Sequence, residues 1–117
     1  MTLPEFKHLV DAAKREVKEI DAAELRRMQQ AGEEFALVDV REPDENARGA
    51  IPGAASIPRG VLELQIDQVT AEKDKPIVCY CGGGSRSALA AQSLQRMGFK
   101  NVMSLAGGYR GWKEGEK

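Results

Sequence analysis

Apolar and polar positions along the chain form short periodic blocks, and the first block predicts an amphipathic helix over residues 4–16. Its apolar stripe consists of five residues at helical spacing: Phe6, Leu9, Val10, Ala13 and Val17. Thr2 and Glu5 are placed to form a capping box at the start of this helix. We expect the helix to lean on the rest of the domain as an N-terminal arm.

The second block predicts a helix that begins after Asp21. Glu24 follows Asp21 at the spacing of a capping pair. Ile20 and Leu25 stand where a hydrophobic staple would pack. We expect this helix to end near Gly32, because glycine is common just beyond a helix C-terminus.

Four short apolar runs predict strands, and two helical stripes lie among them. The runs cover residues 35–40, 54–57, 76–80 and 101–105. The stripes consist of Leu62, Ile66 and Val69, and of Ala90, Leu94 and Met97 before Gly98. Strands that alternate with helices are typical of an α/β domain with a mainly parallel sheet covered by helices.

Length and charge limit the classes to which the chain can belong. Its 117 residues fit one domain. Its 17 basic and 18 acidic side chains give a net charge of −1, so nucleic acid and anionic membranes are poor partners. No apolar stretch approaches the roughly 20 residues that cross a bilayer, and charged residues interrupt the positions that a signal peptide keeps apolar. We expect a soluble cytoplasmic protein.

Two cysteines, Cys79 and Cys81, and one histidine, His8, are too few ligands for a structural zinc site, so no metal is expected. A disulfide between residues only two apart would be strained, so at least one free thiol needs an explanation. Cys79 lies inside a predicted strand and is expected to pack in the core. His8 lies on the polar side of the first helix and is expected to be solvated.

Cys81 lies between a predicted strand and a predicted helix, at the sheet edge where parallel sheets bind ligands. Three glycines follow it, and they allow several N–H groups to turn toward one centre. Those groups, the helix N-terminus and the charge of Arg86 should favour a thiolate at neutral pH and hold an anion beside it. A buried, inert cysteine beside a glycine turn is the alternative, but the combination favours a nucleophile.

Four motifs, in order along the chain, resemble those of single-domain rhodaneses, the thiosulfate sulfurtransferase-like family. They are residues 39–45 (DVREPDE), 49–54 (GAIPGA), 81–86 (CGGGSR) and 105–112 (LAGGYRGW). The resemblance implies a rhodanese-like α/β fold over residues 17–117, with a mainly parallel five-stranded sheet flanked by helices. Residues 1–16 then form an N-terminal helical extension.

The resemblance also implies a sulfurtransferase. Cys81 would attack the outer sulfur of thiosulfate or a related donor, release sulfite, and hold the sulfur as a persulfide until a thiophilic acceptor removes it. The implied partners are a small anionic donor and a thiol or cyanide acceptor, with a protein as a further candidate acceptor. No cofactor is implied.

The residues expected at the site have three roles: Cys81 as nucleophile; Gly82, Gly83, Gly84, Ser85, Arg86 and Arg59 as substrate-binding groups; and Asp39 and Arg41 as support. Ser85 is expected to add a hydroxyl donor. Arg59, at the start of a neighbouring helix, is expected to steer an anionic donor. Asp39 and Arg41 are expected to brace neighbouring loops, with a structural ion pair as their simplest role.

Two departures from the family pattern stand close to the second motif. Ala50 replaces a histidine that is common in the family, and Asn46 replaces an aromatic residue. The loss of the histidine removes a hydrogen bond that helps to lock the loop, so loop rigidity or donor preference is expected to differ.

Two other functions stay open. One is a cysteine-dependent phosphatase or arsenate reductase, whose loop has one residue more between cysteine and arginine than this chain has between Cys81 and Arg86. The other is a sulfur-carrier or interaction module that does not turn over.

Overall fold

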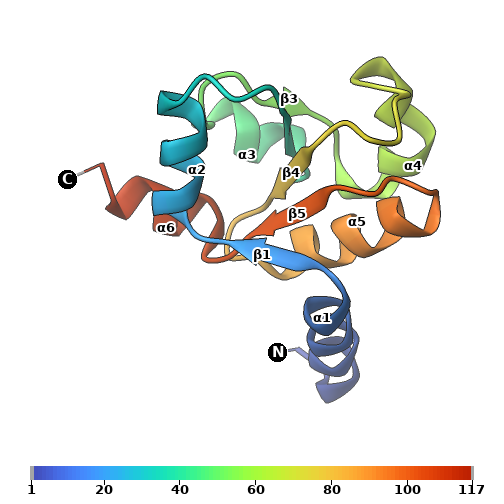
Figure 1. The fold of residues 1–117 in the computed structure, drawn as a ribbon. Coiled ribbons are helices and arrows are strands. Elements are labelled where there is room, and N and C mark those ends of the chain that lie inside the picture. Colours follow the sequence, from blue (N-terminus) through green and yellow to red (C-terminus); the bar gives the residue numbers. More distant parts are fainter. Residues whose placement is uncertain (1, 117) are drawn as a thin grey trace.

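The computed structural model describes residues 2–116, in which a parallel sheet lies between layers of helices (Figure 1). The sheet has five strands, which pair in the order β1-β5-β4-β2-β3, all parallel. The strands are β1 (Lys18–Ile20), β2 (Ala36–Asp39), β3 (Ala55–Ser56), β4 (Ile77–Tyr80) and β5 (Val102–Leu105). The α/β class and the five-stranded parallel sheet expected from the sequence are confirmed.

Six α-helices accompany the strands in the described residues. They are α1 (Pro4–Glu16), α2 (Ala22–Gln30), α3 (Pro43–Ala47), α4 (Leu62–Gln65), α5 (Ser85–Arg96) and α6 (Gly108–Glu114), with 3₁₀ turns at Arg59–Val61 and Ile66–Gln68. Within residues 2–116, no helix combines the length and the apolar character that crossing a membrane requires.

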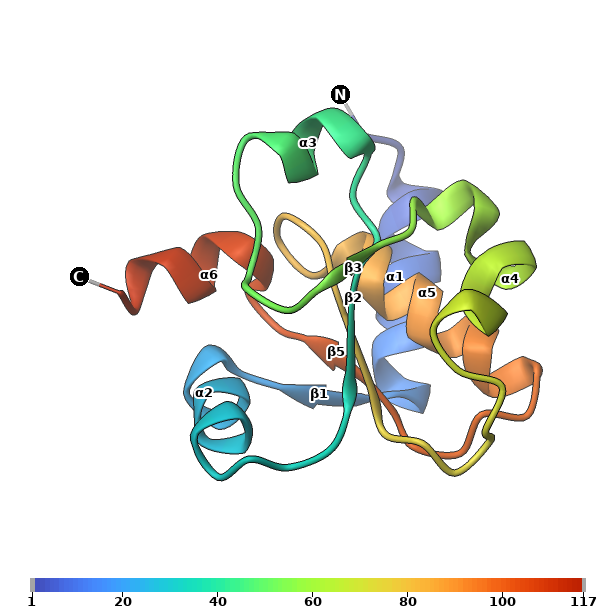
Figure 2. The same cartoon turned by 90° about the horizontal axis from the view of Figure 1, so that it is seen from above.

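The two faces of the sheet bury different side chains because successive strand residues point to opposite sides. Val38 and Cys79 belong to the core under α4 and α5, whereas Leu37 and Val78 belong to the core with α2 and α6. Seen from above, α5 and α4 lie on one side of the sheet and α2 and α6 on the other (Figure 2). Both faces of the central strands are therefore covered, which explains why these strands read as continuous apolar runs.

Helix α1 packs against α5. Val10 and Ala13 are buried there, and the carboxylate of Glu16 accepts a hydrogen bond from Gln92. The expected N-terminal arm thus packs on its own domain.

The two predicted helix starts have different outcomes. Asp21 caps α2 as expected, because its carboxylate accepts a hydrogen bond of 2.8 Å from Glu24 N. The capping box at Thr2 and Glu5 is wrong: α1 begins after Leu3, which makes no side-chain cap. Pro4 explains the difference. Proline keeps the preceding residue, Leu3, extended, and because proline has no N–H, it is well suited to the first helical position, where an N–H would have no partner within the helix.

Candidate active site

The loop after β4 wraps around the sulfur of Cys81. Gly84 N lies 3.1 Å from Sγ and Ser87 N lies 3.4 Å from it, so both N–H groups donate to the sulfur. Gly84 has φ +108°, a left-handed conformation that favours glycine, and it caps the N-terminus of α5. The first turn of α5 is thereby aimed at the thiol.

Helix α6 fixes the other side of this loop. Tyr109 N donates to the carbonyl of Cys81 over 2.7 Å, and Arg110 N donates to the carbonyl of Gly82 over 3.2 Å. Because the C=O and N–H of one trans peptide point in opposite directions, the N–H groups of Gly82 and Gly83 are turned away from α6. Gly108 permits this approach: its φ is +58°, and a Cβ there would lie 2.6 Å from the Cys81 oxygen.

A hydroxyl pair completes the surroundings of the sulfur. The Ser87 hydroxyl lies 3.5 Å from Sγ, where it can donate to the thiolate, and it lies 2.8 Å from the hydroxyl of Ser104 on β5. Both serines are fully buried. The hydroxyl next to the sulfur is thus that of Ser87, whereas Ser85, the hydroxyl donor expected from the sequence, lines the neighbouring cavity two residues earlier in the chain.

These contacts determine the ionisation of the two thiols. Burial is the largest influence on Cys81 and opposes the thiolate, but hydrogen bonds from Ser87, Gly84 and Gly83 outweigh it and lower the pKa of Cys81 below its ordinary value. Burial raises the pKa of Cys79 to about 12. The surroundings thus favour the thiolate at Cys81 and disfavour it at Cys79, which is a core residue.

Arg86 does not stand free beside the sulfur. Its guanidinium binds both oxygens of Glu45 at 2.8 and 3.1 Å, and this contact is the main reason that the pKa of Glu45 falls to about 2. Arg86 also comes close to Gly82, where a Cβ would lie 3.3 Å from its Nη2. Arg86 thus pairs mainly with Glu45, and its interaction with Cys81 is a smaller contribution to its raised pKa.

Asp39 and Arg41 form a buried ion pair at 2.7 Å. Burial opposes the Asp39 carboxylate, but hydrogen bonds from Arg41 and Asn46 outweigh it and lower its pKa. Arg41 also donates to Gly49 O over 2.7 Å. The pair braces the segment between β2 and β3. Asn46, a departure from the family pattern, contributes to this brace through its hydrogen bond to Asp39.

The loop that contains Ala50 is held without a histidine. Tyr80 accepts a hydrogen bond of 3.0 Å from Ile51 N and donates one of 3.1 Å to Asp39. Together with the bond from Arg41 to Gly49, these contacts tie the loop to the sheet edge.

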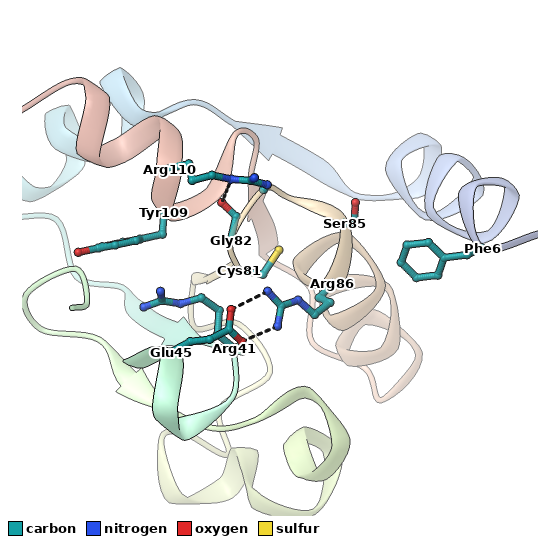
Figure 3. A pocket seen from close by; sticks show the side chains of 10 residues that line it. Phe6, Arg41, Glu45, Cys81, Gly82, Ser85, Arg86, Tyr109 and Arg110 are labelled. Atoms are coloured by element: carbon teal, nitrogen blue, oxygen red, sulfur yellow. Dashed lines mark hydrogen bonds and ion pairs between the residues drawn. The ribbon is translucent and has the colours of Figure 1, made fainter. Parts of the chain in front are cut away.

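A cavity of about 560 Å³ lies beside the Cys81 loop (Figure 3). Six of the residues that the sequence predicted for the site line this cavity: Arg41, Cys81, Gly82, Gly83, Ser85 and Arg86. Arg59 is not among them: it pairs with Glu63 at 2.8 Å, so the structure does not bring it to this cavity. In residues 2–116 no group of three or more His, Cys, Asp or Glu side chains is arranged to hold a metal ion.

Sequence reasoning missed four further lining residues: Phe6, Glu45, Tyr109 and Arg110. They come from α1, α3 and α6, which tertiary packing brings to the loop. Ser87 did have a signal in the sequence, because it shares the inward face of its helix with Ala90, Ala91 and Leu94. A polar residue on such a stripe needs a buried partner.

Comparison with known proteins identifies the family. The sequence model of the rhodanese-like domain family matches residues 21–115 of the chain. The chain belongs to the rhodanese-like domain family. Among its relatives, a sulfurtransferase of Allochromatium vinosum is 35% identical over 82% of this chain and 88% of its own length. The thiosulfate sulfurtransferase GlpE of Coxiella burnetii is 36% identical over 68% of this chain and 73% of its own.

A solved structure shares the fold over nearly the whole chain. A protein of unknown function from Rhodopseudomonas palustris, described as a possible tyrosine phosphatase, has a TM-score of 0.90 and 36% identity, and the match covers 99% of this chain and 95% of that one. This match extends beyond the family model to include α1. Taken together, the sulfurtransferase relatives support a general sulfurtransferase function, with sulfur donors and acceptors as partners.

Proposed function

We propose that this rhodanese transfers sulfane sulfur through a persulfide on Cys81, with thiosulfate or a related anion as the donor. The observation that carries the proposal is the set of donors aimed at Sγ: two main-chain N–H groups at 3.1 and 3.4 Å and the Ser87 hydroxyl at 3.5 Å. Such donors stabilise a thiolate and, equally, the negative charge of a persulfide formed on it.

The reaction has two half-reactions. The Cys81 thiolate attacks the outer sulfur of thiosulfate, a new S–S bond forms, and sulfite leaves with the electron pair of the old one. A nucleophile such as cyanide or a thiolate then attacks the terminal sulfur of the persulfide, takes it as thiocyanate or as its own persulfide, and returns the Cys81 thiolate. The proposed cycle uses no histidine base, because the donors around Sγ favour the thiolate form of Cys81.

The position of Arg86 argues against phosphatase chemistry. A phosphatase needs the loop arginine for the oxygens of the phosphoryl group, whereas the Arg86 guanidinium is bound to both oxygens of Glu45. The loop is also one residue shorter than a phosphatase loop, which suits a single added sulfur atom better than a tetrahedral anion.

Mass spectrometry of the protein after incubation with thiosulfate tests the proposal directly. We expect the mass of one sulfur atom to be added to a peptide that contains Cys81, and thiocyanate to form on each turnover when cyanide is present. The Cys81→Ala variant should lose both signals, whereas Cys79→Ala should keep both because Cys79 is fully buried with a raised pKa.

Three outcomes would contradict parts of this proposal. A persulfide without turnover would make the chain a sulfur carrier. The absence of both in the wild-type protein would exclude thiosulfate as the donor, and hydrolysis of an aryl phosphate that depends on Cys81 would favour the phosphatase.

A further inference from the structure

Three arginines line the cavity, and they differ in how their charge is compensated. Arg41 is paired with Asp39 at 2.7 Å, and Arg86 is paired with Glu45 at 2.8 Å. Arg110 makes no ion pair with a carboxylate in residues 2–116; its Nε donates to the neutral carbonyl of Gly82 over 3.2 Å. Arg110 therefore carries the uncompensated positive charge of the cavity.

The backbone of α6 determines where this charge lies. The main-chain bonds from Tyr109 and Arg110 to the loop carbonyls hold the first turn of α6 against the loop. The Arg110 side chain extends along the loop, on the opposite side of the Cys81 sulfur from Arg86 in the view of Figure 3. A Cβ on Gly83 would collide with Arg110 Nη2, so the glycine leaves the space that the guanidinium occupies.

We propose that Arg110 forms an anion-binding subsite at the mouth of the cavity and selects substrates in which a negative group lies one or two bonds from the atom that Cys81 attacks. Its Nη1 and Nη2 groups provide the donors, in the fork geometry that suits the oxygens of a sulfonate or carboxylate. The substrate class is thus the small thiosulfonate or carboxylate anion. The biological role of the subsite rests on the proposed function, but its existence does not.

Alkylation of Cys81 by iodoacetate and by iodoacetamide measures this subsite without sulfur chemistry. The two reagents are nearly the same size, and only iodoacetate carries a negative group next to the attacked carbon. We expect Arg110→Gln to slow iodoacetate roughly three- to tenfold, the effect of unit charges about 6 Å apart at an exposed site. Iodoacetamide should change less than about twofold, and added salt should reduce the wild-type preference.

The matched control is Lys113→Gln, which makes the same change of net charge on the same helix. Lys113 lies outside the cavity and is paired with Glu116 at 3.3 Å. Its alkylation rates should equal those of the wild-type protein. An equal effect of both variants, or an equal change with both reagents in Arg110→Gln, would overturn the subsite.

Steady-state kinetics then separate the subsite from the proposed function. With thiosulfate and cyanide, Arg110→Gln should raise the KM for thiosulfate at least threefold with a smaller change in kcat, and Arg110→Lys should recover part of the loss. An altered alkylation ratio in a protein that transfers no sulfur would leave the subsite standing and refute the sulfurtransferase. Sulfur transfer by Arg110→Gln with an unchanged alkylation ratio and an unchanged KM would refute the subsite and leave the sulfurtransferase standing.

Discussion

Removal of one hydroxyl tests whether the surroundings of Cys81 create its thiolate. Ser87→Ala deletes the side-chain donor at 3.5 Å from Sγ and leaves the main-chain donors of Gly84 and Ser87 in place. Because the hydroxyl favours the charged form of the sulfur, its loss must raise the pKa of Cys81. Ser85→Ala is the matched control, since it removes a hydroxyl from the same helical turn.

The expected size follows from the geometry. A hydrogen bond to a charged group contributes about 1.5–3 kcal/mol, and the 3.5 Å separation places this one at the lower end. About 1.4 kcal/mol corresponds to a tenfold change in an equilibrium constant. The thiolate fraction of Ser87→Ala should therefore fall roughly tenfold at a pH below the inflection of the wild-type protein.

The assay is the rate of alkylation by iodoacetamide as a function of pH, because this rate follows the thiolate fraction. Ser87→Ala should move the inflection to higher pH and keep the limiting rate at alkaline pH, whereas Ser85→Ala should leave the inflection in place. A shift in Ser85→Ala with none in Ser87→Ala would refute the assignment of the donor and restore the role that the sequence gave to Ser85.

Two further predictions concern stability. Arg86 is the main cause that lowers the pKa of Glu45 from 4.5 to about 2. In urea unfolding, the wild-type protein should therefore be more stable than Glu45→Gln above pH 4.5, and this advantage should disappear as the pH falls toward 2. A difference in unfolding free energy that stays constant with pH would contradict the pairing. Gly108→Ala should destabilise the fold by roughly 2–4 kcal/mol, because its Cβ would lie 2.6 Å from the Cys81 oxygen. The control Gly111→Ala adds its methyl group in open space and should stabilise α6 by up to about 1 kcal/mol. Equal urea midpoints for the two variants would argue against the close approach of α6 to the loop.

The fold was predictable where burial leaves a pattern. Central strands covered on both faces read as apolar runs, and β2, β4 and β5 lie within the predicted ranges. β1 was not located from the pattern, since only one of its three residues is buried. α3 and α6 are too short to show a clear helical period, so they had no comparable signal.

The site was predictable where it is local. The Cys81 loop is contiguous in the chain, and its direction follows from a strand that feeds a helix. The pairing of Arg86 with Glu45 spans 41 positions, and the reach of Arg110 to Gly82 spans 28. Arg59 fails for a different reason: the sequence placed it at the correct sheet edge, but its guanidinium pairs with a local carboxylate, that of Glu63 one helical turn away, and does not reach the cavity. Which charge a side chain meets is decided by packing.

The three glycines after Cys81 look interchangeable in the printed sequence, yet they should tolerate mutation to very different degrees. A methyl group on Gly82 meets only the tip of a flexible Arg86, so alanine there should cost little. On Gly83 it would evict Arg110 and alter selectivity without unfolding the protein, whereas on Gly84 it would oppose the backbone itself at φ +108°. Natural variation among relatives should follow this gradient, with the first glycine drifting freely, the second changing together with position 110, and the third nearly invariant.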